Sequence, residues 1–234
     1  MRKLIIVLIV LFIIPLVINA QVIHELNEQI TFDREGNAEL KVFLKSEKGY
    51  FKELLIPFNC KGENKEVLGE NLFVAKKISI QGIDYLYVSK LDSSNFKECT
   101  IIVKIKKYYD FNSEEISDFR NYLLKYRFIN TRFPLIKNYS LKIILPNNYN
   151  ITSIDESIPK ATEDSPKSPF KLGNNNGNYF VELNGEDVKL GENLYIKFRF
   201  KENEKSMLLG ILFGIIAIGY LIVFRDLRKP KANK

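Results

Sequence analysis

The side chains that most often perform catalysis or bind metals are scarce in this sequence. Histidine occurs once, at His24, and the two cysteines are Cys60 and Cys99. A structural zinc site needs about four such ligands at short, regular spacing, and these three residues match no zinc pattern. The sequence also contains no GxSxG, HExxH, phosphate-binding loop or dinucleotide fingerprint. We therefore expect no metal, no cofactor and no catalytic residue of these kinds.

Pairs of carboxylates leave one enzymatic alternative open, because a glycosidase-type hydrolase needs only two facing acids. The adjacent acids are Glu114 with Glu115 and Glu186 with Asp187. Neighbouring side chains point in different directions on a helix or a strand, so these pairs are poor candidates for one shared site. An extracytoplasmic carboxylate-based hydrolase remains the alternative to a protein without enzymatic activity.

The stretch from Met207 to Phe224, MLLGILFGIIAIGYLIVF, contains no charged residue. As a helix its 18 or so residues would extend about 27 Å, which is enough to cross a bilayer core. The tail that follows, residues 225–234, is strongly basic and is expected in the cytoplasm by the positive-inside rule. We predict a transmembrane helix at 207–224.

The first 20 residues have the pattern of a secretory signal peptide. Arg2 and Lys3 precede an apolar run, and Ala20 offers a small residue for cleavage. An uncleaved signal anchor is the alternative. Both interpretations place residues 21–205 outside the cell membrane and attach the chain to the lipid bilayer. With the signal peptide removed, the chain is expected to cross that membrane once, at 207–224.

The basic character of the chain is concentrated at its two ends. The formal net charge is +7, and most of it comes from residues 2–3 and 225–234. The segment between them is nearly neutral, with acids and bases mixed, whereas a nucleic-acid groove needs clustered positive charge. We therefore expect no nucleic-acid partner.

Two kinds of covalent modification are suggested by the exported segment. Its even cysteine count favours a disulfide between Cys60 and Cys99, with two reduced, buried thiols as the alternative. The sequons NYS at Asn138 and NIT at Asn150 could accept glycans, although chance alone gives about as many.

Alternating apolar residues predict a mainly β exported segment. The run EQITFDREGNAELKVFLK is typical of a hairpin with Gly36 near the turn, and KKISIQGIDYLYVS predicts two more strands around Gln81-Gly82. The turn spacing favours an immunoglobulin-like β-sandwich. We expect two such modules, at 21–109 and 127–205.

One helix is expected between these modules, at 110–126. In NSEEISDFRNYLLKY, Asn112 could cap the helix and Glu115 could complete a capping box. Ile116, Phe119 and Leu123 then fall at helical spacing and would pack on a sheet. The polar, proline-containing stretch 156–178 is expected to be a long exposed loop.

The second half resembles extracytoplasmic β-sandwich modules of single-pass, membrane-anchored surface proteins of archaeal type. The shared features are a strand closing in LP, a long loop, a Gly/Asn-rich turn, a GEN turn, a strand with alternating aromatic residues, and an anchor helix. Ribophorin-like ectodomains are distantly similar. This resemblance implies a membrane-anchored fold and assigns no residue role.

Small residues on the expected anchor helix suggest an association surface. Ser206, Gly210 and Gly214 recur every four residues, and such stripes let two helices approach closely. The stripe could serve a homodimer or a partner subunit, or the helix could be a passive tether. We expect a binding or structural module, or an accessory subunit of a membrane complex, with other membrane or surface proteins as partners.

Overall fold

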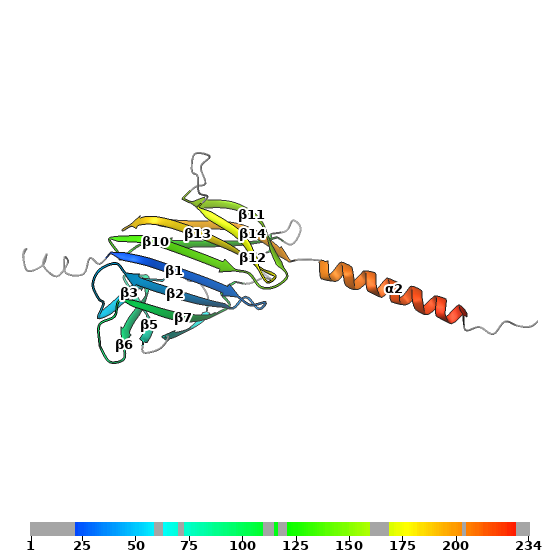
Figure 1. The fold of residues 1–234 in the computed structure, drawn as a ribbon, viewed down its shortest axis with the longest axis horizontal. Helices are drawn as coiled ribbons and strands as arrows, with labels where there is room; N and C mark the ends of the chain where they lie inside the picture. Colours follow the sequence, from blue (N-terminus) through cyan, green and yellow to red (C-terminus); the bar gives the residue numbers. More distant parts are fainter. Residues whose placement is uncertain are drawn as a thin grey trace, which may run out of the picture. The chain divides into compact units, whose positions relative to one another are not determined.

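The protein is built mainly from β-strands, followed by one long helix (Figure 1). The structure, a computed structural model, describes residues 22–58, 63–69, 73–109, 115–116, 121–159, 169–202 and 205–227. The elements are β1 Ile23–Phe32, β2 Ala38–Ser46, β3 Glu53–Pro57, β4 Glu63–Gly69, β5 Phe73–Ile80, β6 Ile83–Lys90, β7 Glu98–Lys106, β8 Glu115–Ile116, β9 Asn121–Ile129, β10 Leu135–Ile144, β11 Tyr149–Ile158, β12 Phe170–Asn175, β13 Asn178–Lys189, β14 Asn193–Glu202 and α2 Lys205–Leu227. The predicted mainly β class is confirmed. The signal segment 1–20 and the end of the tail lie outside the described residues.

A seven-stranded sheet joins the two halves of the sequence. Its order is β12-β13-β10-β1-β2-β7-β4, and β1 pairs with β10 in parallel from Ile23 opposite Ile136 to Thr31 opposite Ile144. Figure 1 shows β13, β10, β1, β2 and β7 side by side. The predicted division into modules at 21–109 and 127–205 is therefore wrong, because one sheet contains strands from both and the described residues up to Lys201 form one compact unit.

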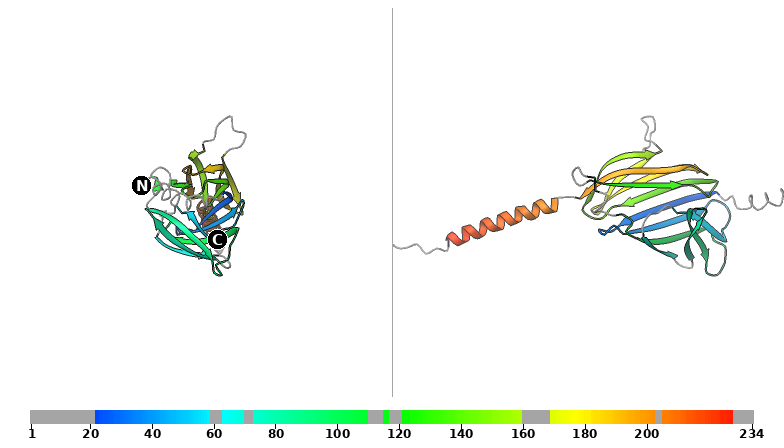
Figure 2. Two further views of the ribbon diagram at one scale, coloured as in Figure 1. Left: turned by 90° about the vertical axis from the view of Figure 1, so that its left-hand side faces the viewer. Right: turned by 180° about the vertical axis from the view of Figure 1, so that it is seen from behind.

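Two smaller sheets share a core with this large sheet. Their orders are β11-β14-β9-β8 and β3-β6-β5, and Figure 2 shows the strands from behind. Phe128 of β9 stacks on Tyr139 of β10 with ring centroids 4.4 Å apart, which ties the four-stranded sheet to the large one. Phe73 of β5 contacts Phe96, beside β7, at 5.1 Å. One hydrophobic cluster includes residues from all three sheets, while the immunoglobulin-like arrangement stays a prediction.

Local sequence signals explain the hairpins. In the turn between β1 and β2, the Asp33 Oδ1 atom accepts the N–H groups of Glu35 and Asn37 at 2.8 and 2.9 Å. Gly36 has a φ of 80°, which glycine adopts without steric cost. Gln81 and Gly82 both have positive φ between β5 and β6, as a tight hairpin turn requires. Both predicted hairpins are confirmed.

The helix predicted at 110–126 is contradicted by strand β9. Within that range the structure describes residues 115–116 and 121–126, and all of them are strand residues. Tyr122, Leu124 and Tyr126 alternate into the core and continue to Phe128, beyond the end of the expected helix. Strand β9 pairs with β14, which is distant in sequence, and the packing buries this face. The alternation of apolar residues along β9 therefore determines the structure, rather than their helical spacing.

The long loop expected at 156–178 contains a strand in its second half. Strand β12 pairs with β13 from Phe170 opposite Leu183 to Asn175 opposite Asn178. Gly173 sits beneath the Phe180 ring, where a Cβ atom would come within 2.3 Å of a ring carbon. The glycine that looked like a loop residue thus makes room for a cross-strand aromatic side chain.

Helix α2 belongs to a second unit, residues 202–234. Its backbone is helical over 23 residues, and the side chains described are those at 210–221 and 224. Large apolar side chains on every face of this stretch are exposed. Counting only the residues whose side chains the structure describes, no helix combines the length and the hydropathy required of a membrane span.

Candidate functional site

The structure separates most of the residues singled out from the sequence. His24 lies on the exposed side of β1, and its carbonyl oxygen accepts the Asn138 side-chain amide at 3.1 Å. Glycosylation of Asn138 would use this same nitrogen and displace the bond. Asn150 lies near the start of β11 and is half-buried. Both glycosylation sites stay predictions.

The structure describes one of the two cysteines, Cys99. Cys99 lies in β7 opposite Leu44, carries a free thiol, and exposes 2% of its surface. Burial raises the pKa of the Cys99 thiol from 9.0 to about 12. Cys60 lies outside the described residues, so the disulfide stays a prediction.

The Cys99 thiol should be inert in the folded chain. In a Cys60→Ser variant at pH 8, a rise of the pKa to about 12 would reduce the thiolate fraction roughly 1000-fold relative to an unfolded cysteine. We expect labelling by a neutral thiol reagent to be slower by at least about 100-fold than in denaturant, measured by mass spectrometry. Equal labelling rates in the two conditions would contradict the burial of this side chain.

The adjacent acids do not form a recognisable site. Glu186 and Asp187 are exposed near the end of β13, where Asp187 has a φ of 51°. Glu114 lies outside the described residues, as does the side chain of Glu115. Among the described residues, no group of three or more histidine, cysteine or acidic side chains is placed to hold a metal ion.

The small-residue stripe lies on helix α2, as expected. Ser206 belongs to the helical backbone, although its side chain lies outside the described set. A Cβ atom added at Gly210 or Gly214 would meet no atom within 4 Å. Association through this stripe stays a prediction.

A buried carboxyl group that the sequence analysis missed lies between the two larger sheets. Glu28 of β1 exposes 4% of its surface. The hydroxyl groups of Tyr126, from β9, and Tyr139, from β10, both donate to its Oε2 atom at 2.6 Å. Burial raises the pKa of Glu28 above 4.5, and the two tyrosine hydrogen bonds oppose that rise. The β1 alternation, with Leu26 and Ile30 inward, could have placed this glutamate in the core.

The raised pKa of Glu28 should make stability depend on pH. Its carboxyl binds protons more readily in the folded chain than in the unfolded chain, so its contribution is fully present below pH 4.5 and falls as pH rises. We expect the wild type to lose free energy of unfolding relative to Glu28→Gln as pH rises from 4.5 towards neutrality, in denaturant titrations of the full chain in detergent micelles. A relative gain over this range would contradict the assignment.

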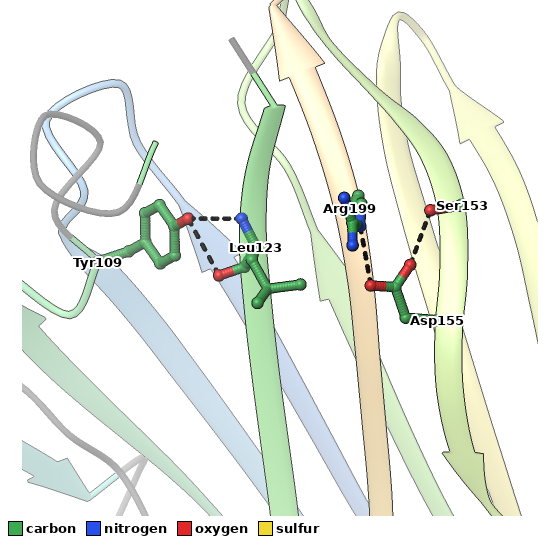
Figure 3. Close-up of polar contacts among 5 residues, drawn as sticks. All are labelled: Tyr109, Leu123, Ser153, Asp155 and Arg199. Carbon is green, nitrogen blue, oxygen red and sulfur yellow. Dashed lines mark hydrogen bonds and ion pairs between the residues drawn. The ribbon is translucent and has the colours of Figure 1, made fainter. Parts of the chain in front are cut away.

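Tyr109 closes part of an open sheet edge. Its Oη–H donates to the Leu123 carbonyl oxygen at 3.1 Å, and the Leu123 N–H donates to the same Oη atom at 3.1 Å (Figure 3). The Tyr109 N–H donates to the Gly36 carbonyl, so this residue links the β1–β2 turn to β9. A tyrosine hydroxyl here satisfies both backbone groups that a neighbouring strand would otherwise satisfy.

Removing the Tyr109 hydroxyl should destabilise the fold. Tyr109→Phe leaves the Leu123 N–H and C=O without their partner, so we expect a loss of about 1–2 kcal/mol in free energy of unfolding. Tyr87→Phe is the matched control, because the Tyr87 hydroxyl has no hydrogen bond among the described residues. The control should change stability by less than about 0.5 kcal/mol. Equal effects in denaturant titrations would show that the hydroxyl bonds contribute nothing.

The outer face of β9 and β14 is rich in basic side chains. Arg199 Nε donates to Asp155 Oδ2 at 2.8 Å, and Ser153 donates to Oδ1 at 2.9 Å (Figure 3). Burial opposes ionisation of Asp155, but these bonds and the charges of Arg199 and Lys197 hold its pKa below its usual range. Lys125 lies directly opposite Lys197 in the register. Two like charges facing each other cost stability, and the interaction of Lys197 with Asp155 offsets part of that cost.

A pocket of about 270 Å³ lies at the far end of β9. Apolar side chains line most of it, with Asp84 and Thr131 as its polar residues; the full lining is Pro57, Phe58, Gly82, Ile83, Asp84, Phe128, Ile129 and Thr131. The Thr131 Oγ1 atom is buried and has no hydrogen-bond partner among the described residues. The pocket, the basic pair and Tyr109 all lie along one strand, which makes β9 the candidate functional site.

Comparisons with known proteins give little further guidance. No protein-family model matches the sequence, and no curated protein matches it. A crystal structure described as that of "a putative protease" from Parabacteroides distasonis is similar, with a TM-score of 0.41 and 8% identity. The similarity covers 76% of this chain and 40% of that one, so this chain spans less than half of that protein. Such a distant similarity defines neither fold nor function.

Proposed function

We propose that this protein is a single-pass membrane protein whose exported β-sandwich segment acts as a binding or structural module, alone or as an accessory subunit of a membrane complex. The observation that supports this most directly is the C-terminal helix. Its 23 residues extend about 34 Å, and a bilayer core is about 30 Å thick. The stretch from Met207 to Phe224 within it carries no charged residue.

The exposed side chains of α2 add support. Ile211, Ile216 and Leu221 expose 52%, 58% and 67% of their surface, and apolar residues occupy every face of this stretch. A helix that is apolar all round is stable only where its surroundings are apolar as well. Lipid is the partner that its chemistry fits best. The basic residues after Phe224 favour a cytoplasmic C-terminus, which leaves the β unit outside.

The hydrolase alternative gains no specific support. Glu28 is the carboxyl group whose environment is most unusual, but it is bonded to two tyrosines inside the core. It does not line the pocket beside β9. A general acid needs access to substrate, so this glutamate acts as a structural group in our proposal.

The topology can be tested with a C-terminal epitope tag on the full chain. Protease added to intact cells should remove the β unit and leave a membrane-bound tagged fragment, because the tail from Arg225 is cytoplasmic. After permeabilisation the tag should also be lost. A tag that is digested in intact cells while the β unit is protected would overturn the proposed topology. Crosslinking in native membranes would then identify partners.

A further inference from the structure

The outward face of β9 and β14 brings three positive charges together. The buried residues of both strands are even-numbered, Tyr126 and Phe198 among them. Lys125, Lys197 and Arg199 are odd-numbered and therefore lie on the opposite, outward face. The register places Lys125 directly opposite Lys197, and Arg199 follows Lys197 by two residues on the same strand. Three cations thus share one small area of the sheet.

The two lysines face each other at close range. The N–H and C=O groups of Leu123 bond to the Tyr109 hydroxyl and so point away from β14. Because the two kinds of pair alternate along antiparallel strands, Lys125 and Lys197 also form a non-hydrogen-bonded pair, in which the Cα atoms are about 4.5 Å apart. Neither lysine forms a salt bridge with a described residue, although the charge of Lys197 acts on Asp155.

Arg199 is held in position through one of its three side-chain nitrogen atoms. Its Nε atom donates to Asp155 Oδ2 at 2.8 Å, and the Ser153 hydroxyl donates to the other carboxylate oxygen at 2.9 Å (Figure 3). Both Nη atoms of Arg199 are without a hydrogen-bond partner in the part of the chain that the structure describes. The Arg199 side chain is 41% exposed. A guanidinium group fixed in this way presents two parallel N–H donors, which suit bidentate binding of a carboxylate.

Charge and spacing together indicate what this face binds. Asp155 compensates one of the three positive charges, so two charges of an anionic ligand would complete the balance. Lys197 and Arg199 lie two residues apart on one strand, a separation of about 6.7 Å. In an extended polypeptide, side chains on one side recur at this same interval. Two acidic residues at alternate positions therefore match the cations in both charge and distance.

We propose that Lys125, Lys197 and Arg199 form a carboxylate-binding site for an extended segment of a partner protein that carries acidic residues at every second position. One carboxylate binds the two Nη atoms of Arg199, and the next lies between Lys125 and Lys197. Asp155 is a positioning residue, because it acts by orienting Arg199. This inference gives binding residues to the binding role proposed above and rests on that role.

The alternative is a face whose charges only keep the protein soluble. Exposed lysines commonly serve that purpose, and Lys125 and Lys197 would then remain solvated. A solvated face attracts any polyanion according to its net charge alone. A carboxylate-binding site, in contrast, distinguishes ligands of equal charge by the spacing of their acidic groups, and it depends on the paired donors of Arg199.

The test uses the full chain in nanodiscs of zwitterionic lipid and two labelled, blocked peptides, each of four glutamates and six threonines. In the first peptide glutamate occupies positions 2, 4, 6 and 8, and in the second it occupies positions 1, 4, 7 and 10. We expect saturable binding of the first peptide by fluorescence anisotropy, weakened by added salt. The second should bind at least about fivefold more weakly, because its glutamates fall on alternating sides of an extended chain.

Three variants separate recognition from net charge and from folding. Lys125→Gln relieves the like-charge pair, so its free energy of unfolding should equal or exceed that of the wild type, while affinity for the first peptide falls at least about fivefold. Arg199→Lys keeps the charge but loses the paired donors, and we expect a similar loss of affinity. Lys104→Gln, at an exposed position of β7, changes the net charge equally and should bind as the wild type does.

Absence of saturable binding, equal affinity for the two peptides, or equal effects of Lys125→Gln and Lys104→Gln would overturn the inference. Tighter binding of the acidic polysaccharide polygalacturonate that also depends on Lys125 would overturn it by assigning the site to a glycan. These outcomes are independent of the membrane topology, because the nanodisc assay leaves both sides of the membrane accessible. Failure of the protease test would therefore overturn the proposed function without deciding whether the three cations bind an acidic segment.

Discussion

The parallel pairing of β1 with β10 is the constraint on which the rest of the structure depends. Strand β1 lies in the middle of the seven-stranded sheet, with the first-half strands β2, β7 and β4 on one side and the second-half strands β10, β13 and β12 on the other. Parallel strands need a long connection, and here roughly a hundred residues separate the two partners. Those intervening residues supply β9, which covers the core beside β10.

Two sets of polar contacts fix the position of β9 relative to the large sheet. Glu28 accepts hydrogen bonds from β9 and β10 together, so its position requires that both strands be correctly placed. Its burial carries a desolvation cost that an apolar residue would avoid. Tyr109 gives a similar link between the β1–β2 turn and β9. Both contacts hold β9 in place against the core.

Local patterns in the sequence predict the hairpins and strands well, because turn residues and alternation are local. Gly36 and Gly82 mark turns that the structure confirms. The sequence gives no comparable signal for β1 pairing with β10, and the two-module prediction failed at that point. The helix prediction failed because its window ended at Tyr126, whereas the alternation that defines β9 continues to Phe128. In both cases the structure depends on pairing between strands that are far apart in the sequence, β1 with β10 and β9 with β14.

The candidate site was harder to predict than the fold. The site depends on which strands become neighbours, and neither Lys125 nor Ile129 belongs to a recognisable motif. The facing of Lys125 and Lys197 follows from the β9–β14 register alone. The basic tail and apolar helix, by contrast, were evident from composition. The anchor that we propose therefore follows from a local pattern in the sequence, whereas the facing of β9 and β14 emerges only after the sheets are assembled.

Residue-resolved hydrogen exchange on the full chain in nanodiscs tests the central claim, a single cooperative β unit built around the pairing of β1 with β10. Amides that pair β1 with β10 and β1 with β2 should share one opening free energy, the highest in the protein. Two groups of strands, one from each half of the sequence, that open with clearly different free energies would contradict the account.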